Sequence, residues 1–195
     1  MLKRFYLPLR SCAEAARVGV GVQRFVASWG VAVTLWEDMM SDDQCIPNLI
    51  EIASDSYQLQ TAQHVAAKKL LDYDGEIFPQ DGCAITLSVL LQEAGIAVPD
   101  IYRAIDLGDQ LKTERNWQVI SIGEQQAGDV GSTCGVEPNH GSDHVYLVLK
   151  VLNFDEMVIA DNQALTPHFR YVSGIGGKTP TKFFLRAANG SPLVS

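Results

Sequence analysis

The sequence lacks several features that mark particular classes of protein. Its 195 residues carry 15 basic and 23 acidic side chains, a net charge of −8, so there is no basic excess for a nucleic-acid surface or for adhesion to an anionic membrane. No apolar run reaches the roughly 20 residues of a membrane-spanning helix, and there is no internal repeat. The four cysteines are widely spaced and include no CxxC pair, which argues against a disulfide-dense scaffold or a zinc ribbon.

The charge that is present divides the chain unevenly. Residues 1–36 contain five basic side chains and a single acidic one, so the rest of the chain carries a net charge of −12. Such asymmetry indicates that the start of the chain is not part of the same compact body. We therefore predict an N-terminal extension over residues 1–45 and one domain over residues 46–195.

This N-terminal extension has three interpretations. The apolar run from Phe25 to Trp36 follows Arg24 and is about as long as the hydrophobic region of a secretory signal peptide. The alternatives are an amphipathic N-terminal helix and a true translation start at Met39 or Met40.

The clearest local pattern is a predicted helix within residues 81–95 that opens with a cysteine. Apolar side chains recur at spacings of three and four from Ile85 to Ala94, which places them on one face, and Gly95 is a typical helix stop. Cys83 lies on the first turn, where unpaired backbone N–H groups and the helix dipole stabilise a thiolate. We predict a nucleophile with a lowered pKa; the alternative is a small buried hydrophobic residue.

The rest of the chain divides into a helical half and a strand half. Residues 47–71 have helical spacing, and residues 98–108 are predicted as a second, short helix with Gly108 as its stop. The predicted strands cover residues 117–122, a short segment from Val130, and residues 143–152, 156–161, 169–172 and 182–185. Helices followed by an antiparallel meander predict an α+β domain with the cysteine-bearing helix packed on the sheet.

Three residues on neighbouring predicted strands complete a candidate site. Adjacent antiparallel strands place His144 beside Asp161 and Asn162. A cysteine nucleophile needs a base within hydrogen-bond reach and a third group that fixes the tautomer of the base. Strand parity favours Asn162 as that group because it shares a face with Val158 and Ala160, while Asp161 faces the other way and is the competing candidate.

This order of motifs resembles the NlpC-type papain-like cysteine peptidases and amidases, which cut bacterial cell-wall peptides. The matching residues are Tyr73, Gly75, Asp81-Gly82-Cys83, the turn Gly128-Asp129-Val130, the strand His144-Val145-Tyr146-Leu147-Val148, and Asn162. The resemblance covers residues 48–163. One difference is Gly82, which separates Asp81 from Cys83 where the family has an adjacent Asp-Cys pair.

The resemblance implies a papain-like fold and a cysteine hydrolase that cleaves amide bonds in peptidoglycan stem peptides without a cofactor. Cys83 would attack the carbonyl, His144 would protonate the leaving amine, and Asn162 would orient the imidazole. The candidates for binding the oxyanion or the substrate are Tyr73, Gln80 and Asp161, together with the backbone N–H of Cys83. A periplasmic, secreted or phage-borne protein is favoured over a cytoplasmic one.

Two other classes of function compete with this interpretation. A metal-dependent hydrolase would use Cys134, His140 and His144, which fall with Asp143 within eleven positions and carry side chains that bind zinc. Pro138 disfavours a helix there, so we prefer a flexible insertion and predict no metal. The second alternative is a non-catalytic module on the same fold that binds cell-wall fragments or a protein partner.

Overall fold

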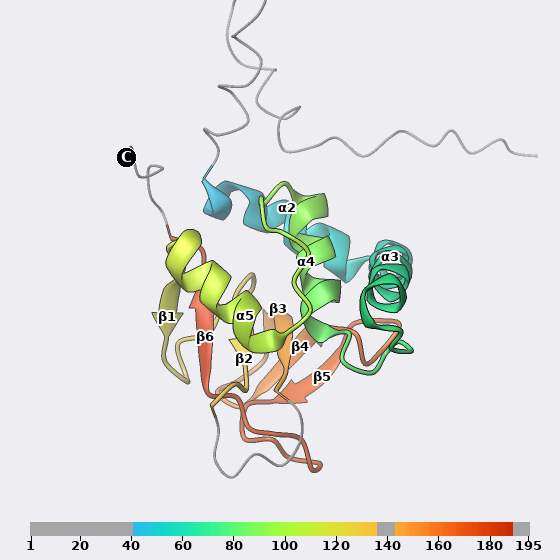
Figure 1. The fold of residues 1–195 in the computed structure, drawn as a ribbon. Helices are drawn as coiled ribbons and strands as arrows, with labels where there is room; N and C mark the ends of the chain where they lie inside the picture. The colour runs from blue at the N-terminus through green and yellow to red at the C-terminus, as the bar shows by residue number, and fades with distance from the viewer. Residues whose placement is uncertain (1–40, 136–142, 189–195) are drawn as a thin grey trace, which may run out of the picture.

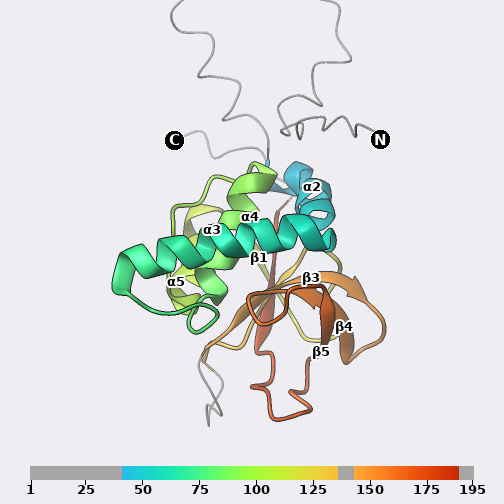
Figure 2. The same ribbon diagram turned by 90° about the vertical axis from the view of Figure 1, so that its right-hand side faces the viewer.

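The computed structural model describes residues 41–135 and 143–188. Within these ranges the fold is α+β, with a layer of helices covering one face of a six-stranded antiparallel sheet (Figures 1 and 2). The helices are α2 (Asp42–Ser54), α3 (Ser56–Asp74), α4 (Cys83–Ala94), α5 (Ala104–Asp109) and the π-helical turn η3 (Gln110–Glu114). The strands are β1 (Gln118–Ile120), β2 (Val130–Ser132), β3 (Val145–Val151), β4 (Glu156–Ala160), β5 (His168–Tyr171) and β6 (Phe183–Arg186). The predicted α+β class with an antiparallel sheet is confirmed.

Helix α2 begins before the predicted domain boundary. Its first residue, Asp42, is buried and accepts a hydrogen bond of 2.7 Å from Trp117 Nε1, and it also pairs with Arg115. Cys45 belongs to the hydrophobic core. A boundary after residue 45 would therefore cut through a packed helix, and the domain includes these earlier residues. Of the extension predicted over residues 1–45, residues 1–40 lie outside the described residues.

The single helix predicted over residues 47–71 is two helices. Asp55 takes an extended conformation between α2 and α3 and caps α3, because its side chain accepts hydrogen bonds from the backbone N–H groups of Tyr57 and Gln58. Aspartate is a favoured residue at a helix start. The periodicity of apolar residues continues across the break, which is why it does not reveal it.

Helix α4 is the central element of the helical layer and begins and ends where the sequence predicts. Gly82 precedes it, and Gly95 ends it with a φ of 96°, the left-handed conformation that glycine adopts without steric cost. The helix contacts α2, α3, α5 and β3, and it is buried on nearly all sides rather than along one stripe, as expected for a helix that is apolar around its circumference. Among the described residues, no helix has the length and apolarity needed to cross a bilayer.

The predicted short helix over residues 98–108 is shifted along the chain. Helix α5 begins at Ala104 and passes through Gly108 into η3. Leu107 and Leu111, both fully buried, lie four residues apart and carry the buried face across the glycine. Gly108 therefore does not stop the helix, because packing on either side of it outweighs its low helix propensity.

The sheet is not the simple meander that the sequence predicts. Its strand order is β1-β6-β2-β3-β4-β5, and all neighbours are antiparallel. The last strand, β6, lies between β1 and β2, so that Leu185 is opposite Val119 on one side and Val130 on the other. The strand that follows His144, β3, lies between β2 and β4, away from both edges of the sheet.

The central strands of the sheet are buried on both faces. The helix-side face packs on the helical layer and includes Val145, Leu147, Ala160 and Leu185. The outer face carries a second cluster, made of Tyr146, Val148, Met157, Ile159, Val172 and Phe184. Alternate residues of β3 therefore belong to different hydrophobic clusters. This alternation decides which side chains can reach His144.

Candidate active site

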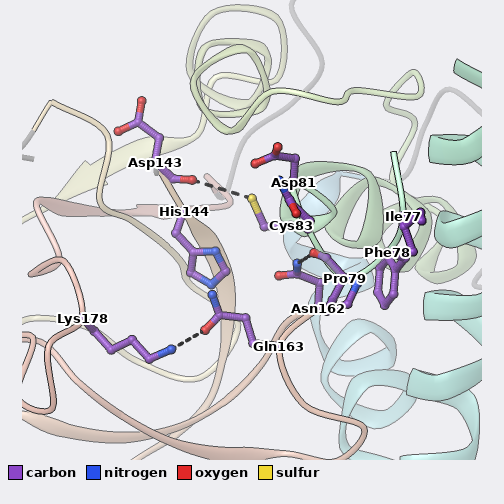
Figure 3. Close-up of a pocket in the computed structure, with 11 residues that line it drawn as sticks. Ile77, Phe78, Pro79, Asp81, Cys83, Asp143, His144, Asn162, Gln163 and Lys178 are labelled. Carbon is purple, nitrogen blue, oxygen red and sulfur yellow. Dashed lines mark hydrogen bonds between the residues drawn. The ribbon is translucent and has the colours of Figure 1, made fainter. Parts of the chain in front are cut away.

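The sequence-predicted nucleophile and base line the same pocket, which has a volume of about 630 Å³ (Figure 3). Its walls come from the loop before α4 with the first residue of α4, the entry to β3, the segment after β4, and the loop between β5 and β6. The lining residues are Ile77, Phe78, Pro79, Gln80, Asp81, Cys83, Asp143, His144, Asn162, Gln163 and Lys178. The fold thus brings together residues that lie as far as 101 positions apart in the sequence.

Cys83 is the first residue of α4, and its side chain is 7% exposed. Its sulfur lies 3.9 Å from the carbonyl oxygen of Asp143, at the entry to β3 (Figure 3). Gly82, which precedes the cysteine, is packed against Phe78, since a Cβ at that position would come within 2.8 Å of the Phe78 ring. The glycine that separates Asp81 from the cysteine therefore has a steric reason in this chain.

The environment of Cys83 corrects the prediction of a lowered thiol pKa. Burial raises the pKa of Cys83 to about 11, although the backbone N–H groups of Val145 and Ala84 act in the opposite direction. A helix start stabilises a thiolate only while the thiolate keeps access to water or a positive partner. Because the described fold buries the sulfur, the resting thiol keeps its proton at neutral pH unless a base accepts it.

His144 precedes β3 and is fixed through its backbone by Thr133. The Thr133 hydroxyl accepts a 2.8 Å hydrogen bond from the His144 N–H, and the Thr133 N–H donates to the His144 carbonyl at 3.0 Å. On the ring, Nε2 lies 2.9 Å from Oδ2 of Asp161. With Nε2 engaged by a carboxylate, Nδ1 is the ring nitrogen left to exchange a proton in the pocket.

The partner of the imidazole is Asp161, so the prediction that Asn162 orients His144 is wrong. His144 and Tyr146 lie on the outer face of the sheet, and Asp161 follows Ile159 on that same face. Asn162 follows Ala160 on the helix-side face, where its Nδ2 donates to the carbonyl of Pro79 at 2.5 Å. The alternation along the strand correctly predicted that Asp161 and Asn162 lie on opposite faces of the sheet. The error concerned His144, which lies on the face away from the helical layer.

Asp161 is buried and held by several polar groups. Its Oδ1 accepts a 2.7 Å hydrogen bond from the Gln163 N–H, and His168 Nε2 lies 3.8 Å from the same oxygen. Burial raises the pKa of Asp161, but the hydrogen bond from His144, the charges of His144 and His168 and the Gln163 N–H together lower it below the usual value of 3.8. Asp161 is therefore ionised at neutral pH and can stabilise an imidazolium.

Two supporting residues escape the sequence analysis. His168 begins β5 opposite Ile159, which places it on the outer face beside Asp161. Gln63, buried on α3, donates to the carbonyls of Asp161 and Ala164, at 2.7 Å each. The pairing of β4 with β5 would have identified His168. Nothing local distinguishes Gln63 from other glutamines of a helix.

The predicted oxyanion candidates differ in where the fold places them. Gln80 lines the pocket. Tyr73 does not; it is 63% exposed and stacks on Tyr102, with ring centroids 3.8 Å apart. Helix α3 ends at Asp74, and the loop that follows carries the chain away from Tyr73 before it reaches Cys83.

The metal alternative is addressed only in part by the described residues. His140 lies outside them, and among the residues that are described no group of three or more histidine, cysteine or acidic side chains could hold a metal ion. Cys134 is a buried free thiol, as is Cys83.

No family model matches this sequence, and comparisons with curated proteins and with solved structures find no match either. The interpretation of the site therefore rests on its own geometry, in which a buried thiol and an imidazole line one pocket, and a buried ionised carboxylate contacts the imidazole.

Proposed function

We propose that the protein is a cysteine hydrolase that cleaves amide bonds, with Cys83 as nucleophile, His144 as base and Asp161 as the residue that orients the base. The observation that carries the proposal is the 2.9 Å contact between Asp161 and His144, since His144 lines the same pocket as Cys83. A nucleophile, a base and an orienting carboxylate are the groups that acyl transfer to a thiol requires. A nucleophile at the start of a helix beside an antiparallel sheet also supports a papain-like arrangement.

The reaction would proceed in two stages. Cys83 Sγ forms a bond to the amide carbonyl carbon while its proton passes to Nδ1 of His144, and the imidazolium is stabilised by Asp161. The C–N bond then breaks, and His144 returns the proton to the leaving amine. In the second stage a water molecule gives a proton to His144 and attacks the thioester, which releases a carboxylic acid and restores the thiol.

The burial of Cys83 gives His144 a defined role in this reaction. A thiol with a pKa of about 11 supplies almost no thiolate at neutral pH. A base within reach removes this limitation because the proton leaves during the attack, and the resulting charge is shared with the imidazolium. The backbone N–H of Cys83 and the side chain of Gln80 are the groups we propose for the developing oxyanion.

Peptides of bacterial peptidoglycan are the substrate class that the sequence resemblance favours. The direct test is digestion of purified cell-wall peptides, with products identified by mass. We expect the wild type to release fragments that differ from the substrate by one water molecule per cleaved amide. Cys83→Ala should abolish this release, whereas Cys134→Ala, which removes another buried thiol, should retain it. Cleavage that survives Cys83→Ala would contradict the proposal.

The raised pKa of Cys83 also supports a second candidate function, that of a non-catalytic binding module. A Cys83 with a pKa of about 11 fits a small buried residue in a non-catalytic module that binds cell-wall fragments or a partner. The two candidates differ in whether His144 changes the reactivity of Cys83. In a binding module, removal of His144 leaves the alkylation rate of Cys83 at neutral pH unchanged; in a hydrolase, it lowers the rate.

A further inference from the structure

The pocket around Cys83 is electrostatically uneven. Lys178 is the one lysine or arginine among the described residues that line it, and the carboxylates belong to Asp81 and Asp143. In Figure 3, Lys178 extends toward Gln163 below the His144 ring, whereas Asp143 lies above the ring and Asp81 lies above the Cys83 sulfur. A bound molecule therefore meets positive charge at one end and negative charge at the other.

Lys178 is held in place by neutral groups. Its Nζ donates a 2.9 Å hydrogen bond to the side-chain oxygen of Gln163, and its backbone N–H donates to the carbonyl of Gly174 at 3.1 Å. Within the described ranges, no ion pair joins Lys178 to a carboxylate. The ammonium charge is thus positioned at the pocket without being neutralised there.

The same contacts tie Lys178 to the proposed catalytic residues. Gln163, which accepts from Lys178, donates its backbone N–H to Asp161 at 2.7 Å. Gly174 permits the turn that returns the chain to this position, because it has a φ of 75° and a Cβ there would lie 2.3 Å from the Lys178 carbonyl oxygen. The cation is therefore anchored to the segment that orients His144.

We propose that Lys178 binds a carboxylate of the substrate, so that the preferred substrates are amides or peptides with an acidic group on the His144 side of the scissile bond. This specificity rests on the proposed hydrolase function. An ammonium forms its strongest contacts with ionised oxygens, and the Asp81 carboxylate, which also lines the pocket, repels an acidic group that binds in the reverse direction. Because Lys178 is exposed, we expect a preference of about three- to tenfold for a carboxylate over the matching carboxamide.

A first test needs no substrate. Iodoacetate and iodoacetamide alkylate a thiolate by the same displacement of iodide, so the ratio of their rates at Cys83 reports the local charge. At pH 9, with peptide mapping by mass to separate Cys83 from the other thiols, Lys178→Met should lower the iodoacetate-to-iodoacetamide ratio about threefold. Lys178→Glu should lower it further. The control Lys182→Met removes an exposed lysine outside the pocket and should leave the ratio unchanged. Equal ratios in the wild type and Lys178→Met would overturn the proposal.

A second test uses paired peptides that differ only in Glu against Gln beside the cleaved amide. The ratio of kcat/KM for the two peptides should favour Glu in the wild type, approach one in Lys178→Met and favour Gln in Lys178→Glu. Cys83-dependent hydrolysis of both peptides at equal rates would contradict the role of Lys178 and leave the hydrolase proposal standing. If neither peptide is cleaved, the hydrolase proposal fails, and the alkylation ratio still decides whether Lys178 attracts anions to this pocket.

Discussion

The two faces of the sheet use the same strands for different purposes. On the helix-side face, Leu147 and Leu185 belong to the apolar cluster that includes the buried residues of α4. On the outer face, the apolar cluster around Tyr146 and Phe184 adjoins buried polar groups, among them Asp161. Cys83 belongs to the helix side, and its proposed base belongs to the outer face, so the pocket lies where the two faces meet at the ends of the strands.

The outer face contains a buried cation as well as the proposed catalytic carboxylate. Arg170 is 6% exposed, lies over the Tyr146 ring at 4.5 Å and donates to the carbonyl of Thr179. The Tyr146 hydroxyl lies 2.5 Å from that of Thr181. Burying such groups is costly unless each has a partner, whereas apolar burial is the main source of stability in the larger cluster on the helix-side face. The comparison indicates that the helix-side face maintains the fold and the outer face maintains the geometry of His144.

The largest expected effect is the difference in activity between variants of Asp161 and of Asn162, the two residues that follow β4. Asp161→Ala should lower kcat/KM by about a hundredfold to ten-thousandfold, because the imidazole loses the group that fixes its tautomer and stabilises its charge. Asn162→Ala should cost less than tenfold, since its side chain holds the Pro79 loop and not the ring. Steady-state hydrolysis of the same peptide by both variants measures the difference. Equal losses, or a larger loss in Asn162→Ala, would contradict the assignment of His144 to the outer face.

A second prediction concerns the packing of the outer face. A Cβ on Gly131 would lie 2.2 Å from the Tyr146 ring, so Gly131→Ala should lower the free energy of unfolding by at least 1–3 kcal/mol, about the cost of overpacking a core. Gly108→Ala is the matched control, because a Cβ there meets no atom within 4 Å and alanine favours a helix by about 1 kcal/mol. Urea unfolding should show opposite signs for the two variants. Equal stabilities would mean that Tyr146 has room to move.

Low pH should lower the free energy of unfolding because it protonates Asp161. Its pKa is lower in the folded chain than the usual 3.8, so its ionised form stabilises the fold above about pH 4, and this contribution is lost as the pH falls through the folded pKa. In Asp161→Asn the contribution is absent at every pH. We therefore expect the difference in free energy of unfolding between wild type and variant to shrink between pH 5 and pH 2. A difference that stays constant over this range would contradict the lowered pKa.

The smallest expected effect comes from His168. Its imidazole lies 3.8 Å from Asp161, too long for a hydrogen bond, so it acts on the carboxylate through charge alone. Because the His168 charge lowers the pKa of Asp161, His168→Gln should raise that pKa and move the acidic limb of the kcat/KM profile to higher pH, with a loss of about two- to fivefold at the acidic end. An unchanged limb would show that His168 has only a structural role.

The sequence predicted those parts of the fold that local patterns determine. The start of α4 at Cys83 and its end at Gly95 follow from apolar spacing and a glycine stop, and the alternation of β3 follows from its period of two residues. The sequence did not predict the order of the strands, because the insertion of β6 between β1 and β2 joins segments that are far apart in the chain. The two helices in place of one depend on a cap at Asp55 that the apolar pattern does not contain.

For the candidate site, the sequence predicted which residues meet at the pocket, but it did not predict how deeply they are buried or which group contacts His144. Cys83 and His144 lie at one pocket as expected. The choice between Asp161 and Asn162 required knowing which face the helical layer covers, which no single strand reveals. The raised pKa of Cys83 is likewise a product of burial by distant segments, and a pattern that identifies a helix start cannot report how deeply that start is buried.

The pH dependence of Cys83 alkylation in the wild type and in His144→Ala tests the central claim most directly. If His144, held by Asp161, accepts the thiol proton, the wild type should react with iodoacetamide at pH 7 at least about tenfold faster than His144→Ala. The variant should become reactive only as the pH approaches the value of about 11 that burial sets for the thiol. Two profiles that superimpose, both rising toward pH 11, would contradict the account and leave the pocket as a binding site with an unactivated cysteine.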